Sequence, residues 1–302
     1  MDISFLEPKR QIELKLEKMY NEYGFKRYEM NKFEQYSFYM ENEQFLEDSR
    51  VITFYGNNGK LLALKPDITM SIIKNCTRSG EDTHKIYYNE SVFRVSKDDN
   101  EFKEINQIGI EYISDIGVSN TVDILKLAIR SLECISEESV FCVSNAGLMV
   151  DILNSICENY TQRNQILVYL REKNLHDLKN YMQNNNLVGY DTLCAIMRVS
   201  SNPIEGIKEL SSILKDEKYK VKLEEMSLII TSICELSHNI VLDLSQIPNI
   251  EFYNDIVFCG YVKGNSKVVL TGGRYDKLAS KIGIKNKNAL GFAVNLSCVK
   301  IK

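Results

Sequence analysis

A long helical pattern interrupts a chain that otherwise carries strand patterns, and this order constrains the fold more than any single motif. Residues 148–238 repeat apolar side chains at helical spacing between polar breaks. Short apolar runs bounded by turn residues, which are typical of strands, precede this block and return from residue 240. The order predicts an α+β fold in which residues 1–302 form one domain and residues 148–238 form a helical insertion within it.

The segments outside the helical block predict an N-terminal helix followed by paired strands. Pro8 suits the first position of a helix, and Gly24 suits the position just after its end. The turn sequence Gly56-Asn57-Asn58-Gly59 predicts a hairpin. Its strands are expected at 51–55 and 60–64, with further strands at 85–95, 104–113, 140–143, 240–244, 252–262 and 267–270, and further helices at 68–77, 121–135 (capped by Asn120) and 275–282.

Composition predicts a soluble cytoplasmic protein without a nucleic-acid or membrane partner. The chain is 44% hydrophobic and 26% charged, with a net charge of −4. The sequence lacks the basic stripe of a tRNA-binding surface, so tRNA binding is not expected. No apolar run approaches about 18 residues, and the N-terminus has no signal-peptide pattern.

The eight cysteines do not form a metal-binding or disulfide pattern. No two of them have the C-x-x-C spacing, and most lie in apolar runs such as Val140–Val143. This favours buried, reduced thiols over disulfides or zinc. Neither a metal nor a cofactor is expected.

One predicted strand gives the best local argument for a binding site. Alternate residues of a strand share a face, so Gln107, Gly109 and Glu111 should lie on one side of the sheet. Gly109 would leave room for a flat polar ligand, with the carboxamide and the carboxylate on either side of it. The alternative is a half-exposed strand with a polar outer face.

Two further segments leave both a site and a structural role open. Asp67 and Thr69 follow Pro66 directly before a predicted helix, where they could hold a ligand or cap the helix. Arg94 ends an apolar strand, and its planar guanidinium suits a phosphate or carboxylate ligand as well as a surface ion pair.

Taken in order, the motifs of this chain resemble the catalytic core of class II histidyl-tRNA synthetases over nearly its whole length. Six ordered motifs at compatible spacing are far more specific than one tripeptide. Apart from the helical insertion, the series is Leu64-Lys65-Pro66-Asp67, Phe93-Arg94, Gln107-Ile108-Gly109-Ile110-Glu111, Phe252-Tyr253-Asn254, Gly272-Gly273-Arg274-Tyr275-Asp276 and Gly291-Phe292-Ala293.

The resemblance implies a six-stranded antiparallel sheet flanked by helices, and a self-dimer through the N-terminal helix and the following strand. It also implies a pocket for a histidine-like ligand, in which the residue at the position of Arg94 grips the α-phosphate of ATP in the synthetases. Asp67 stands where the synthetases carry glutamate. The expected pocket residues are Asp67, Thr69, Arg94, Gln107, Glu111 and Tyr253, beside a pocket loop of Gly272, Gly273, Arg274 and Tyr275.

Part of this set also allows a structural interpretation. Glu111 could face Arg94 or Arg274 across the sheet and hold the fold together even in an empty pocket. Gly272 and Gly273 could serve a turn that needs positive φ.

The departures from the synthetase pattern fall on residues that perform chemistry. Cys298 stands where the last synthetase motif carries an ATP-binding arginine, and Pro248 stands where an earlier motif carries an arginine of the activation step. The loop from Ser96 to Lys103 also lacks the arginines of the synthetases. Because losing one charge-stabilising donor typically costs about 3–4 kcal/mol in the transition state, we expect no adenylate formation and assign no catalytic residue.

This combination is similar to the regulatory subunits of ATP phosphoribosyltransferase (HisZ type), which are synthetase paralogues without aminoacylation activity. The similarity implies a non-catalytic subunit that a short catalytic subunit needs for activity, in the first step of histidine biosynthesis. It further implies feedback inhibition by histidine and a hetero-octamer with the catalytic subunit. The end of the chain at the last motif matches the short members, which have no anticodon-binding domain.

Several alternatives stay open on the sequence alone. The chain could be another histidine-sensing or tRNA-related synthetase paralogue, or a truncated histidyl-tRNA synthetase. The inhibitory histidine could bind in the pocket or at the interface with the catalytic subunit. Either the insertion or the N-terminal region could contact that subunit.

Overall fold

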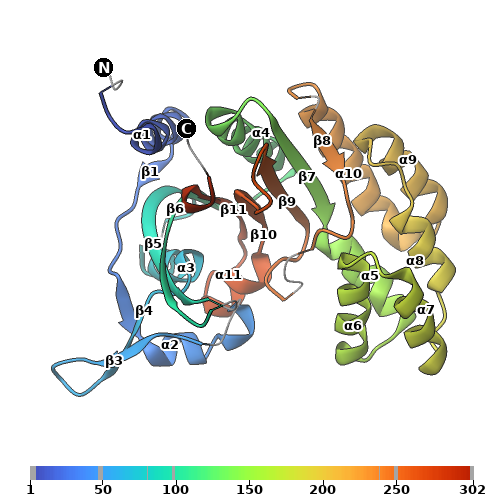
Figure 1. The fold of residues 1–302 in the computed structure, drawn as a ribbon, viewed down its shortest axis with the longest axis horizontal. Coiled ribbons are helices and arrows are strands. Elements are labelled where there is room, and N and C mark those ends of the chain that lie inside the picture. The colour runs from blue at the N-terminus through green and yellow to red at the C-terminus, as the bar shows by residue number, and fades with distance from the viewer. Residues whose placement is uncertain are drawn as a thin grey trace.

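An eight-stranded sheet forms the centre of the molecule (Figure 1). The computed structural model describes residues 5–46, 50–79, 81–96, 99–237, 239–247 and 251–299. Within these ranges the six central strands are antiparallel, as the sequence predicted, and a short parallel strand extends each edge. The order is β1 (Lys26–Arg27), β5 (His84–Val95), β6 (Phe102–Ser114), β11 (Asn288–Asn295), β10 (Leu270–Arg274), β9 (Ile256–Val262), β7 (Ser139–Asn145) and β8 (Ile240–Leu242).

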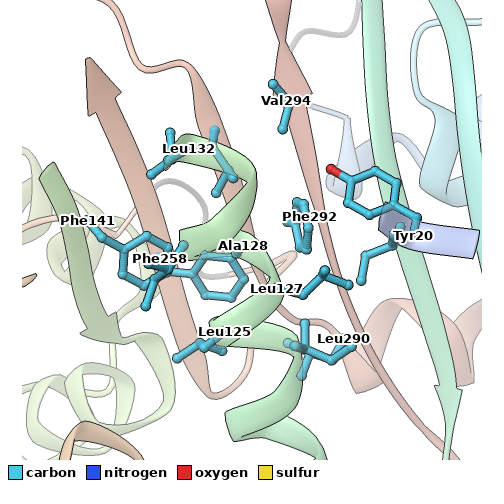
Figure 2. Close-up of a cluster of buried hydrophobic side chains, with 14 of the residues drawn as sticks. Tyr20, Leu125, Leu127, Ala128, Leu132, Phe141, Phe258, Leu290, Phe292 and Val294 are labelled. Carbon is cyan, nitrogen blue, oxygen red and sulfur yellow. The ribbon is translucent and has the colours of Figure 1, made fainter. Parts of the chain in front are cut away.

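Helices α1 (Pro8–Glu22) and α4 (Val118–Ile135) cover one face of this sheet. Leu127, Ala128 and Leu132 of α4 are buried, and Figure 2 shows them packed over Phe292 of β11 and its neighbours. Tyr20 of α1 joins the same cluster, and its hydroxyl lies 3.1 Å from the Ser131 hydroxyl of α4. Burying a leucine such as Leu127 or Leu132 contributes about 1.5–3 kcal/mol, and the two helices make this face a core of the fold.

The opposite face carries a second apolar cluster and leaves room for a site. Helix α3 (Ile68–Ser79) packs on helix α11 (Asp276–Ile282), and both lie over this face. A small sheet of β2 (Phe33–Gln35), β4 (Leu61–Leu64) and β3 (Thr53–Tyr55) adjoins them, together with α2 (Tyr36–Met40) and the 3₁₀ helix η1 (Glu43–Phe45).

Between β7 and β8 the chain forms a block of helices with its own apolar cluster. Most of these helices begin at an asparagine or aspartate whose side chain accepts a backbone N–H, as Asn145 does for Leu148 at 2.8 Å. Figure 1 places the block at the end of the molecule away from α1. The helices are α5 (Ala146–Ile156), α6 (Tyr160–Arg171), α7 (Leu175–Asn184), α8 (Tyr190–Met197), α9 (Pro203–Ile213) and α10 (Glu217–Cys234).

Several predicted boundaries were wrong for identifiable reasons. Helix α4 begins at Val118 and not at residue 121, because Gly117 is its cap and Asn120 lies in the first turn, where its side chain accepts the Gly117 N–H at 3.2 Å. The strand expected from residue 252 begins at Ile256, after a turn. The strand expected at 267–270 runs instead from Leu270 to Arg274, so the predicted pocket loop is largely strand.

In the described ranges, no helix combines the length and apolar character needed to cross a membrane. No cluster of three or more His, Cys, Asp or Glu suited to a metal ion occurs there either. The expectation that the cysteines are buried was only partly right: Cys76, Cys157 and Cys194 are buried, whereas the other five are partly exposed.

Candidate functional site

A cavity of about 170 Å³ opens on the less covered face of the sheet, and we call it the Glu111 cavity. Its floor comes from β6, β11 and β10, and its walls come from β5, the start of α3 and the segment before β9. All six expected pocket residues line it. The lining is Phe45, Asp67, Ile68, Thr69, Tyr88, Arg94, Gln107, Glu111, Phe252, Tyr253, Thr271, Tyr275, Gly291, Phe292 and Ala293.

Glu111 is a deeply buried acid of the cavity. Its side chain is 2% exposed, and its carboxylate accepts hydrogen bonds from the Thr69 hydroxyl at 2.6 Å and from the Tyr275 hydroxyl. Burial raises the pKa of Glu111 from 4.5 to about 8, although the two hydroxyl donors oppose this shift. Burial thus favours the protonated form of the Glu111 carboxyl, which has two hydroxyl partners.

The expected ion pair between Glu111 and an arginine is replaced by these hydroxyl contacts. Arg274 points elsewhere: its Nε donates to Asp276 at 2.7 Å, and its Nη1 lies 3.6 Å from Asp255. The Arg94 Nε donates to the Pro66 carbonyl at 3.0 Å, at the rim of the cavity. Arg94 carries the only basic side chain among the described residues that line the cavity.

The space over Gly109 is filled by a side chain of the protein, which corrects the expectation that a ligand lies there. Tyr88 is directly opposite Gly109 on β5. A Cβ atom at position 109 would lie 2.6 Å from the Tyr88 hydroxyl oxygen and 2.2 Å from the Phe292 carbonyl oxygen. Glycine at this position therefore allows Tyr88 to lie against the sheet, so the room for a ligand is shifted toward Gln107 and Glu111.

Asp67 has the capping role that the sequence left open, and Thr69 contacts Glu111. The Asp67 Oδ1 accepts the Met70 N–H at 2.8 Å, which caps the start of α3. Thr69 donates to Glu111 from the first turn of the same helix. Both residues also line the cavity, so the cap holds the first turn of α3 against the site.

The two glycines of the predicted pocket loop contribute by their lack of a side chain. Gly272 faces the core, where a Cβ would meet the Phe292 Cβ at 2.5 Å. Gly273 faces the site, where a Cβ would meet the Tyr253 ring at 2.7 Å. Neither has the positive φ that the sequence interpretation required. Of the four loop residues, Tyr275 lines the cavity.

Sequence reasoning missed a buried ion pair at the edge of the site. Lys65 is 1% exposed, and its Nζ lies 3.2 Å from the Glu90 carboxylate. Burial lowers the pKa of Lys65, while Glu90 opposes the shift. Glu90 is directly opposite the cavity residue Gln107. The only sequence feature that pointed to this ion pair was the lysine within Leu64-Lys65-Pro66-Asp67. The motif alone does not reveal that this lysine is buried.

The end of the last motif adds no cation to the cavity. Cys298 lies in the 3₁₀ helix η2 (Leu296–Cys298), and its carbonyl oxygen accepts a hydrogen bond from the Asn265 side chain. Pro248, the other departure from the synthetase pattern, lies outside the described residues.

Comparison with known proteins identifies the fold. The family model for histidyl-tRNA synthetase matches residues 4–299. A structure from Bacillus halodurans C, described as an ATP phosphoribosyltransferase regulatory subunit/histidyl-tRNA synthetase, superposes with a TM-score of 0.84 at 22% identity, covering 98% of this chain and 83% of that one. The ATP phosphoribosyl transferase (HisG:HisZ) complex from Thermotoga maritima gives 0.76 at 18% identity and 98% of both chains.

The fold and the residues of the Glu111 cavity thus define a class II synthetase-like protein, and the chain belongs to the histidyl-tRNA synthetase family. Within that family, a relative in Clostridium botulinum (strain 657 / Type Ba4) is named ATP phosphoribosyltransferase regulatory subunit. It is 29% identical over 317 residues, which span 99% of this chain and 74% of the relative.

Proposed function

We propose that this chain is a non-catalytic regulatory subunit of ATP phosphoribosyltransferase. In this role it is required for the activity of a separate short catalytic subunit and gives the assembly feedback inhibition by histidine. The observation that carries the proposal is Cys298 at the position where the resemblance places a synthetase arginine, in a chain whose six expected pocket residues all line one cavity. The names of the relatives support the same assignment.

The proposal includes the loss of amino-acid activation. Adenylate formation needs cations at the developing charge of the phosphate, and one arginine lines the cavity within the described chain. ATP–pyrophosphate exchange with histidine should therefore stay at background. Exchange at the rate of an active synthetase would favour the alternative of a truncated histidyl-tRNA synthetase.

We assign the Glu111 cavity to a histidine-like ligand. Glu111 and the Thr69 and Tyr275 hydroxyls provide donors and acceptors for an imidazole, and Gln107 and Tyr253 add polar groups on either side. Histidine inhibits if it binds more tightly to an inactive arrangement of the assembly than to the active one. The competing location is the interface with the catalytic subunit.

The expected assembly is a hetero-octamer built on a self-dimer through the N-terminal region. Helix α1 and the short edge strand β1 are the elements that this dimer would use. Cross-linking and mass measurement of the purified complex would give the stoichiometry.

The decisive experiment titrates a short catalytic subunit from the same organism with this chain and measures ATP phosphoribosyltransferase activity. Saturable activation, followed by inhibition when histidine is added, is the expected result. No effect at micromolar excess would reject the proposal in favour of another histidine-sensing or tRNA-related paralogue.

Two variants locate the histidine within the assembled complex. Glu111→Gln should weaken inhibition by histidine, whereas Glu104→Gln, at an exposed position of the same strand, should leave it unchanged. If histidine inhibits both variants equally, the histidine site lies at the subunit interface and not in the Glu111 cavity.

A further inference from the structure

Two cysteines lie directly opposite each other on neighbouring strands of the central sheet. Cys142 of β7 is the register partner of Cys259 of β9. The sequence separates them by more than a hundred residues and by the whole helical insertion, so spacing alone gives no sign of the pair. Both thiols are free and partly exposed.

The register fixes which kind of antiparallel pair they form. The Ala146 N–H donates to the Asp255 carbonyl at 2.8 Å, and the Lys263 N–H donates to the Glu138 carbonyl at 2.8 Å. In an antiparallel ladder, hydrogen-bonded pairs recur at every second residue. Each of these two pairs lies four residues from the cysteines, so Cys142 and Cys259 also form a hydrogen-bonded pair. Such pairs have Cα atoms about 5.5 Å apart, which falls within the range of protein disulfides.

The surroundings of the two thiols favour reaction at Cys259. The thiol of Cys142 and the hydroxyl of Tyr261 both form hydrogen bonds with the Cys259 sulfur, which lowers the pKa of Cys259. The same contact, together with burial, raises the pKa of Cys142. Cys259 is therefore the thiol of the pair that ionises more readily, and a thiolate is the form that attacks an oxidant.

The pair also has a defined place relative to the Glu111 cavity. Cys259 is the register partner of Thr271 on β10, and Thr271 is the partner of Ala293 on β11. Directly opposite residues share a face of the sheet. The two cysteines therefore lie on the same face of the sheet as Thr271 and Ala293, in one row across the strands. Thr271 and Ala293 line the cavity.

We propose that Cys142 and Cys259 form a reversible cross-strand disulfide, with hydrogen peroxide or a similar peroxide as the oxidant. The Cys259 thiolate attacks one peroxide oxygen, the O–O bond breaks, and the departing hydroxide takes a proton to become water. This leaves a sulfenic acid on Cys259. The Cys142 sulfur then loses its proton and attacks the Cys259 sulfur, so that an S–S bond forms, the S–O bond breaks and a second water leaves.

In net terms, two thiols and one peroxide become one disulfide and two waters. A dithiol reductant restores the thiols by exchange. Such transient bonds are the kind that reducing compartments tolerate. The site is independent of the proposed regulatory function, because it depends only on the register of β7 and β9.

The test oxidises the full chain with hydrogen peroxide and then counts free thiols with a maleimide mass tag after unfolding. The count should fall from eight to six. Peptide mapping without reductant should find residues 142 and 259 in one cross-linked species that has lost two hydrogens, and a dithiol reductant should return the count to eight.

Three variants serve as controls for the pairing. Cys259→Ser should keep all seven remaining thiols free under the same oxidant. Cys142→Ser should form no disulfide and lose at most the Cys259 thiol, as a sulfenic acid, whereas Cys298→Ser should still lose two. The inference is overturned if the wild-type chain keeps eight tagged thiols, if the cross-link joins other cysteines, or if it joins two copies of the chain. The mapping of the wild-type chain decides the outcome even where a serine variant folds poorly.

Discussion

Glu111 and Gly291 are directly opposite each other on β6 and β11, and the Glu111 carboxylate occupies the space that a side chain at 291 would need. A Cβ atom at position 291 would lie 1.9 Å from the Glu111 Oε2 and 2.5 Å from the Ile110 carbonyl oxygen. The buried acid of the cavity therefore depends on a glycine of the neighbouring strand, which is why the Gly-Phe-Ala motif belongs to the site although it supplies no reactive group.

Gly291→Ala should displace the Glu111 carboxylate and lower the free energy of unfolding by about 1–3 kcal/mol, the usual cost of forcing a methyl group into a packed site. Urea denaturation measures this cost. Gly117→Ala is the matched control, because a Cβ there meets open space and should cost at most about 1 kcal/mol at the helix cap. Equal losses in both variants would contradict the packing argument.

The protonation of Glu111 should make stability depend on pH. In the folded chain its pKa is about 8, against 4.5 when exposed, so between these values the folded state holds a proton that the unfolded state has released. The free energy of unfolding should therefore fall as pH rises from about 5 to about 8, by up to about 1.4 kcal/mol per pH unit from this group.

Glu111→Gln removes that contribution, because the amide does not titrate. Denaturation curves of the wild-type chain and the variant, measured across this pH range, should converge or cross as pH rises. Parallel stability profiles would show that the folded chain ionises Glu111 at its ordinary pKa.

The two roles of Asp67 can be separated by choice of substitution. Asparagine is as good a cap as aspartate, so Asp67→Asn should leave the free energy of unfolding nearly unchanged, whereas Asp67→Ala should lower it by about 1 kcal/mol. If the Asp67 charge also contacts the ligand, isothermal titration should show weaker histidine binding in Asp67→Asn. Unchanged binding together with unchanged stability would leave Asp67 as a cap alone.

The resemblance to the synthetases implied both the antiparallel sheet and the six pocket residues, which all line one cavity. It could do so because ordered motifs are local features of the sequence. The sequence did not predict features that depend on contacts between distant segments. Tyr88 fills the space over Gly109, and this depends on the register of β5 and β6. The burial of Lys65 depends on how the Leu-Lys-Pro-Asp turn packs against β5, and no neighbouring residue in the sequence reveals it.

Arg274 was expected beside the pocket, but its contacts predict a purely structural role. Its guanidinium is mostly buried between Asp255 and Asp276, and Asp276 also accepts the Ala289 N–H at 2.8 Å. Arg274→Met removes the cation that these two carboxylates contact, so it should lower the free energy of unfolding by about 1–3 kcal/mol. It should not change the affinity for histidine. Lys263→Met is the matched control: its ion pair with Glu138 is exposed on both sides and should contribute less than about 1 kcal/mol. A variant at Arg274 that keeps full stability but loses histidine binding would return this arginine to the ligand site.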